Sequence, residues 1–79
     1  MTTHELKTLP EYFLDICSRS KNFELRKNDR NYKVGDYLVL KEFDGEKFTG
    51  KKVKRLVSYI LSDVEQFGLM NGFCIMGLE

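Results

Sequence analysis

The dipeptide Asp44-Gly45 lies between two apolar segments, and this arrangement constrains the fold more than any other feature of the chain. Asp-Gly is typical of a tight β-hairpin turn, because both residues tolerate positive φ angles. The uninterrupted apolar run of residues 37–40 precedes the turn, and a strand predicted from about Thr49 to Leu61 follows it. We therefore predict two antiparallel strands, the first of them at the centre of the core and covered on both faces.

A further strand signal lies upstream, where Phe23 and Leu25 alternate with Glu24 and Arg26. Alternation with period two is typical of a strand that has one buried and one exposed face. We expect a strand over residues 22–27 with its carboxylate and its guanidinium together on the outer face. At a rise of ~3.3 Å per residue these two side chains start about 7 Å apart. They either hold one ligand together or simply pair in solvent.

Shorter signals predict the remaining elements. Residues 4–7 favour a first strand, and an apolar stripe at helical spacing predicts a helix that runs to about Ser18, with Thr8 and Glu11 as its capping box. Residues 62–71 are expected to form a loop with one short helical turn, anchored by the apolar residues Phe67, Leu69 or Met70, before a last strand over residues 73–78.

These elements predict an α+β, mainly β fold in which one helix lies between the first two of five strands. A flat sheet of this size would expose costly edges, so a small closed or nearly closed antiparallel β-barrel of five to six strands is favoured. With 79 residues and 42% hydrophobic content, residues 1–79 are expected to make a single domain with one modest core.

Several classes of protein are disfavoured by composition. No segment approaches the ~18 to 20 apolar residues of a membrane span, and the first residues lack the features of a signal peptide, so we expect a cytoplasmic protein with no membrane partner. Cys17 and Cys74 lie far apart without CxxC spacing. Buried free thiols are therefore expected, with no disulfide framework, metal site or cofactor.

The net charge of +1 conceals a strong segregation of charge along the chain. Residues 19–33 carry six basic and two acidic side chains, and residues 47–55 carry five basic side chains and no acid. If these two segments are neighbours after folding, they form a basic patch suited to the phosphates of a nucleic acid. The alternative is that the lysines only keep a small surface soluble.

The stretch from Arg19 to Arg26 resembles the signature of ASCH domains, Gly-x-Lys-x-x-Glu-x-Arg, with Lys21, Glu24 and Arg26 in register. Arg19 departs from this pattern, since the family usually has glycine at that position. Glycine adopts left-handed backbone angles easily, whereas arginine does so only at a cost in free energy. Residues 4–7, 22–30 and 34–36 together resemble a subfamily of short bacterial and phage ASCH-related proteins whose function is unknown. The similarity spans nearly the whole chain.

The resemblance implies a PUA-like β-barrel with a cleft between helix and barrel, where RNA or a nucleotide-like ligand is expected to bind. The site residues expected in this cleft or at its rim are Lys7, Lys21, Glu24, Arg26, Lys27, Asn28 and Arg30. Arg26 can hold a phosphate in two bonds or stack on a base, whereas a surface pair with Glu24 is worth only ~0 to 1 kcal/mol. Lys21 has a structural alternative as well, because a cation there complements the helix C-terminus.

Other side chains are weaker candidates for the same cleft. His4 belongs to the first strand, but a lone histidine near a terminus is more often exposed. Aromatic side chains can stack on bases, yet in so small a barrel they are more often core. The aromatic candidates are Tyr12, Tyr32, Tyr37 and Phe48. Of these, Tyr32 is the one that we expect outside the core, because it lies in a polar loop.

Two other classes of function stay open beside RNA or nucleotide binding. The wider ASCH group includes amidohydrolases that act on modified cytidines and proteins described as ribonucleases, and here Lys21 and Glu24 would be the catalytic pair. The chain carries no other enzyme signature such as GxSxG, a Walker loop or HExxH. The third class is a regulatory protein-interaction module, since some relatives are linked to the activation of osmoprotectant transport.

Overall fold

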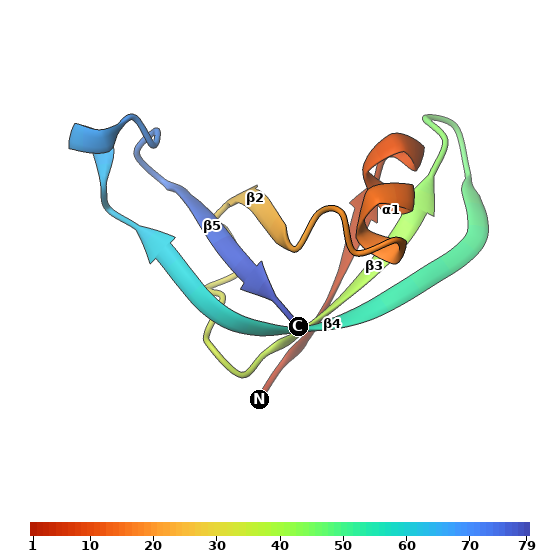
Figure 1. Ribbon diagram of the computed structural model, residues 1–79, viewed down its shortest axis with the longest axis horizontal. Coiled ribbons are helices and arrows are strands. Elements are labelled where there is room, and N and C mark those ends of the chain that lie inside the picture. Colours follow the sequence, from red (N-terminus) through yellow and green to blue (C-terminus); the bar gives the residue numbers. More distant parts are fainter.

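The computed structural model describes residues 1–79 as a curved five-stranded sheet with one short α-helix (Figure 1). The elements in chain order are β1 (Thr3–Thr8), α1 (Pro10–Cys17), β2 (Phe23–Lys27), β3 (Tyr37–Phe43), β4 (Phe48–Ser62), the 3-10 turn η1 (Glu65–Phe67) and β5 (Phe73–Leu78). The sequence-based expectation of five strands and one helix between the first two strands is confirmed.

The long strand β4 joins the two halves of the sheet, whose order is β1-β3-β4-β5-β2. Its first part pairs antiparallel with β3, from Phe43 opposite Phe48 to Tyr37 opposite Leu56. Its second part pairs antiparallel with β5, from Val57 opposite Leu78 to Ser62 opposite Cys74. The strand bends strongly between these parts, so that the two halves rise like the arms of a V with α1 against one arm (Figure 1).

The sheet differs from the predicted barrel in two ways. β1 and β2 are its two edge strands and do not pair with each other, so the sheet is not closed. β1 also pairs with β3 in parallel, with Thr3 opposite Tyr37, so the all-antiparallel prediction is wrong for this pair. The physical reason is the connection, because α1 and β2 carry the chain across before β3 begins and such a crossover permits parallel pairing.

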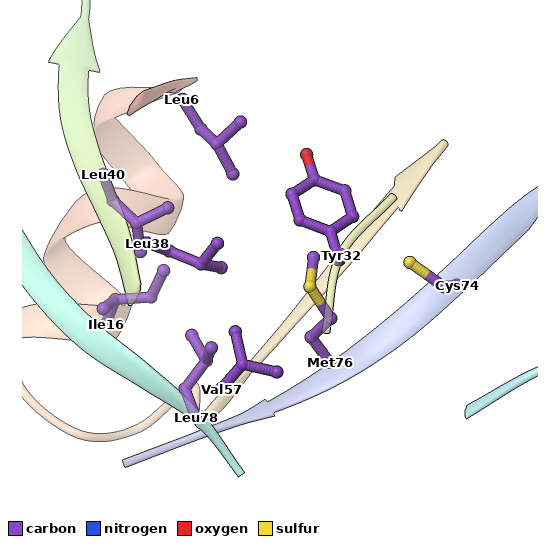
Figure 2. Close-up of a cluster of buried hydrophobic side chains, with 9 residues drawn as sticks. All are labelled: Leu6, Ile16, Tyr32, Leu38, Leu40, Val57, Cys74, Met76 and Leu78. Atoms are coloured by element: carbon purple, nitrogen blue, oxygen red, sulfur yellow. The ribbon is translucent and has the colours of Figure 1, made fainter. Parts of the chain in front are cut away.

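The core lies in the concave side of the sheet, where nine buried side chains make contact (Figure 2). Leu38 and Leu40 of β3 are fully buried within it, and Ile16 covers them from α1. Tyr37 and Val39 on the opposite face of β3 are only half-buried, so the predicted burial of both faces is wrong for that face. Cys74 is a buried free thiol whose pKa is raised by burial, whereas Cys17 is exposed, contrary to prediction. Tyr32, expected at the surface for base stacking, is only 4% exposed and is part of this core.

Two turns predicted from short sequence signals are present in the structure. The Asp44-Gly45 hairpin is present, and the Asp44 carboxylate accepts backbone hydrogen bonds from Glu46 and Lys47, both at 2.9 Å. The short helical turn η1 is confirmed too, but two of its proposed anchors are not buried, since Phe67 is 82% and Met70 69% exposed. No helix of this structure has the length and apolar character that crossing a membrane requires.

The start of α1 corrects the predicted capping box. Thr8 ends β1, the N-cap is Leu9, and no side chain caps the helix. Pro10 supplies the first helical residue, where its missing N–H costs nothing. At the other end, Arg19 adopts φ 70°, a left-handed angle that glycine takes more easily. The turn from α1 into β2 therefore has the left-handed backbone angle expected of the glycine in the ASCH signature, although arginine occupies this position.

Candidate functional site

A cleft of about 420 Å³ opens where the C-terminal end of β1, the helix α1 and the strand β2 meet. We call it the α1–β2 cleft. Its charged lining consists of Lys7, Lys21, Glu24 and Arg26. Its remaining lining consists of Thr8, Leu9, Tyr12, Phe23 and Leu25. Four residues that the sequence nominated, one on β1, one between α1 and β2 and two on β2, therefore border one cavity.

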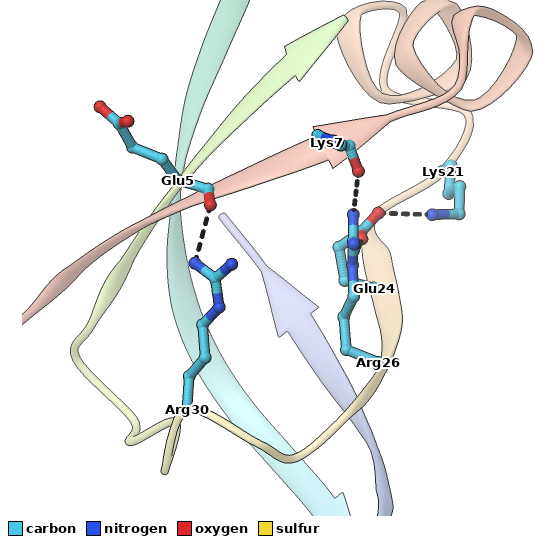
Figure 3. A network of polar contacts seen from close by, with 6 residues as sticks. All are labelled: Glu5, Lys7, Lys21, Glu24, Arg26 and Arg30. Carbon is cyan, nitrogen blue, oxygen red and sulfur yellow. Dashed lines mark hydrogen bonds and ion pairs between the residues drawn. The ribbon is translucent and has the colours of Figure 1, made fainter. Parts of the chain in front are cut away.

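Glu24 is the centre of the polar network in this cleft (Figure 3). The residue is 3% exposed, and its Oε1 accepts a hydrogen bond from Nζ of Lys21 at 2.7 Å. Its Oε2 accepts one from Nε of Arg26 at 2.8 Å. A buried carboxylate needs such partners, because an unpaired charge is strongly disfavoured away from water. Glu24 thus holds two cations in place at the wall of the cleft.

This network corrects the predicted orientation of β2. Phe23 and Leu25 are 47% and 53% exposed, whereas Glu24 is buried and Arg26 is half-buried. The alternation was predicted correctly, but the inner and outer faces are exchanged. Ion pairing with Lys21 and Arg26 makes the buried position of the carboxylate possible, and neither partner is an apolar residue that a hydrophobic pattern would detect.

Two arginines, one on β2 and one in the loop after it, reach the free edge of β1 (Figure 3). Nη2 of Arg26 donates to the backbone carbonyl of Lys7 at 2.7 Å, and Nη1 of Arg30 donates to that of Glu5 at 2.8 Å. Both carbonyls belong to β1, two residues apart, so they lie on the same edge of the strand. The two guanidiniums donate to carbonyls of a strand edge that β2 does not pair with. Arg26 also lines the cleft, whereas Arg30, nominated for its rim, is not part of the cleft lining.

Aromatic rings surround the Lys21 ammonium. Nζ lies 5.4 Å from the ring centroid of Tyr12 and 5.0 Å from that of Phe23, within the range of cation–π attraction. Tyr12 is 45% and Phe23 47% exposed, so both rings keep surface that a planar ligand can reach. Sequence reasoning named Tyr12 among several aromatics and treated Phe23 as core; the exchanged faces of β2 are what bring Phe23 to the cleft.

Thr8 is a cleft residue that sequence reasoning did not nominate for the site. The residue is 4% exposed, and its Oγ1 is the one buried side-chain polar atom without a hydrogen-bond partner. A hydroxyl buried without a partner costs about 1–3 kcal/mol, so each such group requires an explanation. Its position in the sequence, directly after the nominated cleft residue Lys7, could have indicated a place in the site. The capping-box prediction instead assigned the Thr8 hydroxyl to the start of the helix.

A family model for a domain of unknown function, DUF3850, matches residues 3–78 of this chain. The chain belongs to the DUF3850 family. It is also 39% identical over 71 residues to an uncharacterized 12.9 kDa protein in the GpA 3' region of Escherichia phage P2. The match covers 86% of this chain and 65% of the phage protein. The expectation of a small phage or bacterial domain of unknown function is confirmed.

Other nominated residues of this DUF3850 domain lie outside the cleft. Lys27 is exposed and is not part of the cleft lining, and Asn28 uses its Oδ1 to accept a hydrogen bond from the Tyr32 backbone at 3.2 Å. The condition for a shared basic patch is not met in this cleft, which takes cations from residues 19–33 and none from residues 47–55. The first half of β4, which carries the second segment, pairs with β3, and β5 lies between β4 and β2 in the sheet.

His4 anchors the DUF3850 domain at the opposite end of β1. It is 8% exposed, not exposed as its position near the terminus predicted, and its Nε2 lies 2.9 Å from Oδ2 of Asp36. That hydrogen bond and those from the backbone N–H groups of Thr2 and Lys33 lower the pKa of Asp36 to about 2, against the opposing effect of burial. The pair fixes β1 to the loop before β3 and so positions the strand that ends at the cleft.

Proposed function

We propose that this chain binds RNA or a nucleotide in the α1–β2 cleft. The observation that carries the proposal is the charge of the lining, in which three cations, Lys7, Lys21 and Arg26, accompany the single carboxylate of Glu24. Both oxygens of that carboxylate are already occupied. The excess positive charge is therefore available to a ligand, and phosphate is the anion that arginine and lysine bind most readily in a groove.

The remaining walls suit the base of a nucleotide. Tyr12 and Phe23 offer partly exposed rings beside the Lys21 ammonium, and stacking on aromatic rings is the usual way to hold an unpaired base. A volume of about 420 Å³ is in the range of small-molecule sites. Charge and aromatic surface together favour a nucleotide over a purely apolar ligand.

The same proposal includes the ASCH-like, PUA-like interpretation of the fold. The open sheet has its gap between β1 and β2, and the arginine bridges to Glu5 and Lys7 cross that gap where strand pairing would close a barrel. Among the residues that match the ASCH signature, Glu24 contacts both Lys21 and Arg26 directly. Their contacts support a common role for the signature residues in this chain.

Titration of the purified protein with labelled single-stranded and hairpin RNA pools, followed by fluorescence anisotropy at two salt concentrations, tests the proposal. The informative variant is Tyr12→Ser, which removes a stacking surface from an exposed helix position. Tyr59→Ser is the matched control, because Tyr59 is 62% exposed and lines neither cavity. We expect about tenfold weaker binding for Tyr12→Ser, from stacking worth ~1–3 kcal/mol, and wild-type binding for the control.

Salt dependence separates this proposal from a protein-interaction module. Phosphate contacts reduce the logarithm of the affinity by about 0.7 per contact for each decade of salt, whereas an apolar partner surface responds weakly. Absence of RNA and nucleotide binding at low salt, or equal effects of the two tyrosine variants, would overturn the proposal.

A small hydrolase acting on a nucleoside or RNA is the second candidate, because Lys21, Glu24 and the unpartnered Thr8 hydroxyl line one cleft. Against it, the two hydrogen bonds to Glu24 favour a carboxylate that holds cations over one that accepts a substrate proton. Incubation with modified cytidines and with RNA, analysed by mass spectrometry, decides the matter. Turnover by the wild type that is lost in Lys21→Ala supports the hydrolase.

A further inference from the structure

A second cavity of about 310 Å³ adjoins the α1–β2 cleft, and we call it the basic depression. Its charged lining consists of Glu5, Lys7, Arg26, Arg30 and Lys41, and Phe48 forms its aromatic wall. Lys7 and Arg26 line the cleft as well, so the two cavities share a wall. A ligand that extends beyond the cleft in this direction passes over the Arg26 guanidinium.

The basic depression is more strongly cationic than the cleft. Four cations face one carboxylate, that of Glu5, which is 69% exposed and 3.7 Å from Nζ of Lys41. So exposed an ion pair at that distance neutralises little of the charge, because water screens it. The depression therefore has the charge of an anion site, and its lining is less apolar than that of the cleft.

The cations of the basic depression are held in position before any ligand arrives. Arg26 and Arg30 are each fixed by a hydrogen bond to a β1 carbonyl, at 2.7 and 2.8 Å. Arg30 uses one of its five N–H donors in this bond, which leaves the rest of its planar fork for a ligand. Nζ of Lys7 lies 4.6 Å from the Phe43 ring, and Nζ of Lys41 lies 4.6 Å from the Phe48 ring. Prepositioned donors lower the ordering cost of binding.

We propose that the basic depression is a phosphate subsite and that the ligand places a base in the α1–β2 cleft and its attached phosphate in the depression. The inference rests on the proposed function and specifies it further. Because the cavities share the wall made by Lys7 and Arg26, base and phosphate belong to one nucleotide or to adjacent nucleotides of one strand. The substrate class is therefore a phosphorylated nucleotide or single-stranded RNA, and a free nucleoside occupies only half of the site.

Calorimetric titration with the four ribonucleosides and their 3'- and 5'-monophosphates tests the subsite. We expect at least one monophosphate to bind about tenfold or more tightly than its nucleoside, since charge-assisted hydrogen bonds to phosphate are strong. Lys41→Ala should reduce that preference severalfold and leave nucleoside affinity unchanged. Lys51→Ala is the matched control, because Lys51 is an exposed lysine of β4 outside both cavities and its loss should alter neither affinity.

The outcomes separate the subsite from the proposed function. Equal binding of nucleosides and monophosphates, or a phosphate preference that Lys41→Ala leaves intact, overturns the subsite while nucleotide binding stands. If RNA binds and mononucleotides do not, the salt slope of RNA binding decides. A decrease of about 0.7 in Lys41→Ala but not in Lys51→Ala supports the subsite, and an unchanged slope overturns it. If neither RNA nor any nucleotide binds, both proposals fail.

Discussion

The carboxylate of Glu24 accepts a hydrogen bond from Nε of Arg26 at 2.8 Å, and the two residues, which alternate with exposed apolar side chains on β2, turn toward the inside of the cleft. Their contact is an ion pair in which the carboxylate is almost inaccessible and the guanidinium keeps contact with solvent and with β1. The pair therefore has both a structural role, at the gap between β1 and β2, and a position suited to binding.

Glu24→Ala should lower the free energy of unfolding by about 2–3 kcal/mol, because it leaves two cations without their shared acceptor. Urea unfolding monitored by circular dichroism measures the change. The matched control is Glu5→Ala, which removes an exposed carboxylate whose ion pair with Lys41 spans 3.7 Å and should cost less than about 1 kcal/mol. A cost for Glu24→Ala no larger than that of the control would contradict the structural role of the buried carboxylate.

Arg19→Gly should raise the free energy of unfolding by about 1 kcal/mol, since Arg19 has φ 70° and glycine adopts left-handed angles without a Cβ penalty. Arg19→Ala is the control, because it removes the same charge and keeps the Cβ. Thermal and urea unfolding of both variants measure the effect. A glycine variant no more stable than the alanine variant would show that the backbone angle stores no strain.

Thr8→Val should raise the free energy of unfolding by about 1 kcal/mol, because it removes a buried hydroxyl that lacks a partner and keeps the shape of the side chain. If that hydroxyl serves the ligand, nucleotide affinity falls in the same variant. Thr49→Val is the matched control with the opposite expectation, since Oγ1 of Thr49 donates to the Glu42 carboxylate at 2.7 Å. A stability loss in Thr8→Val would mean that its hydroxyl already has a favourable environment in the free protein.

Asp36 should make the domain sensitive to acid. Its pKa is lowered from 3.8 to about 2 by the hydrogen bonds from His4, Thr2 and Lys33, so its contribution to stability is complete above the unfolded-state value. That contribution is lost as the pH falls from about 4 through about 2, because the protonated carboxyl binds its partners less well. Asp36→Asn should therefore be less stable than the wild type at neutral pH, with a difference that shrinks as the pH falls through this window.

Urea unfolding at a series of pH values between 2 and 7 measures this difference, with all other carboxyl groups common to both proteins. Asp63→Asn is the control, because Asp63 is exposed and asparagine tolerates its φ of 57°. A stability difference between wild type and Asp36→Asn that stays constant with pH would contradict the assigned origin of the low pKa.

Much of the fold was predictable from short-range signals. The Asp44-Gly45 turn, the apolar run of β3 and the alternation in β2 each correspond to an element of the structure, since turn chemistry and side-chain periodicity are local properties. The partner of β1 was not predictable in this way. Its parallel pairing with β3 joins residues more than thirty positions apart, and no local pattern encodes that pairing.

The residues of the candidate site were likewise predictable only in part from the sequence. Lys7, Lys21, Glu24 and Arg26 were nominated from the sequence and border one cleft, whereas Lys27, Asn28 and the second basic segment lie elsewhere. Thr8, Phe23 and Lys41 were found only in the structure. The sequence assigned Thr8 to a helix cap and Phe23 to the core, and it assigned no role to Lys41. Their contributions to the site depend on neighbours that are distant in the chain.

The sequence by itself determined the number, type and approximate bounds of the elements, together with the alternation of charged and apolar side chains along β2. Only the tertiary structure decided which face of β2 is buried. Period two requires alternate residues to face opposite ways, but it does not say which set faces inward. Here Lys21 and Arg26 neutralise the Glu24 carboxylate inside the cleft, and this pairing of buried charge outweighs the hydrophobic preference of Phe23 and Leu25.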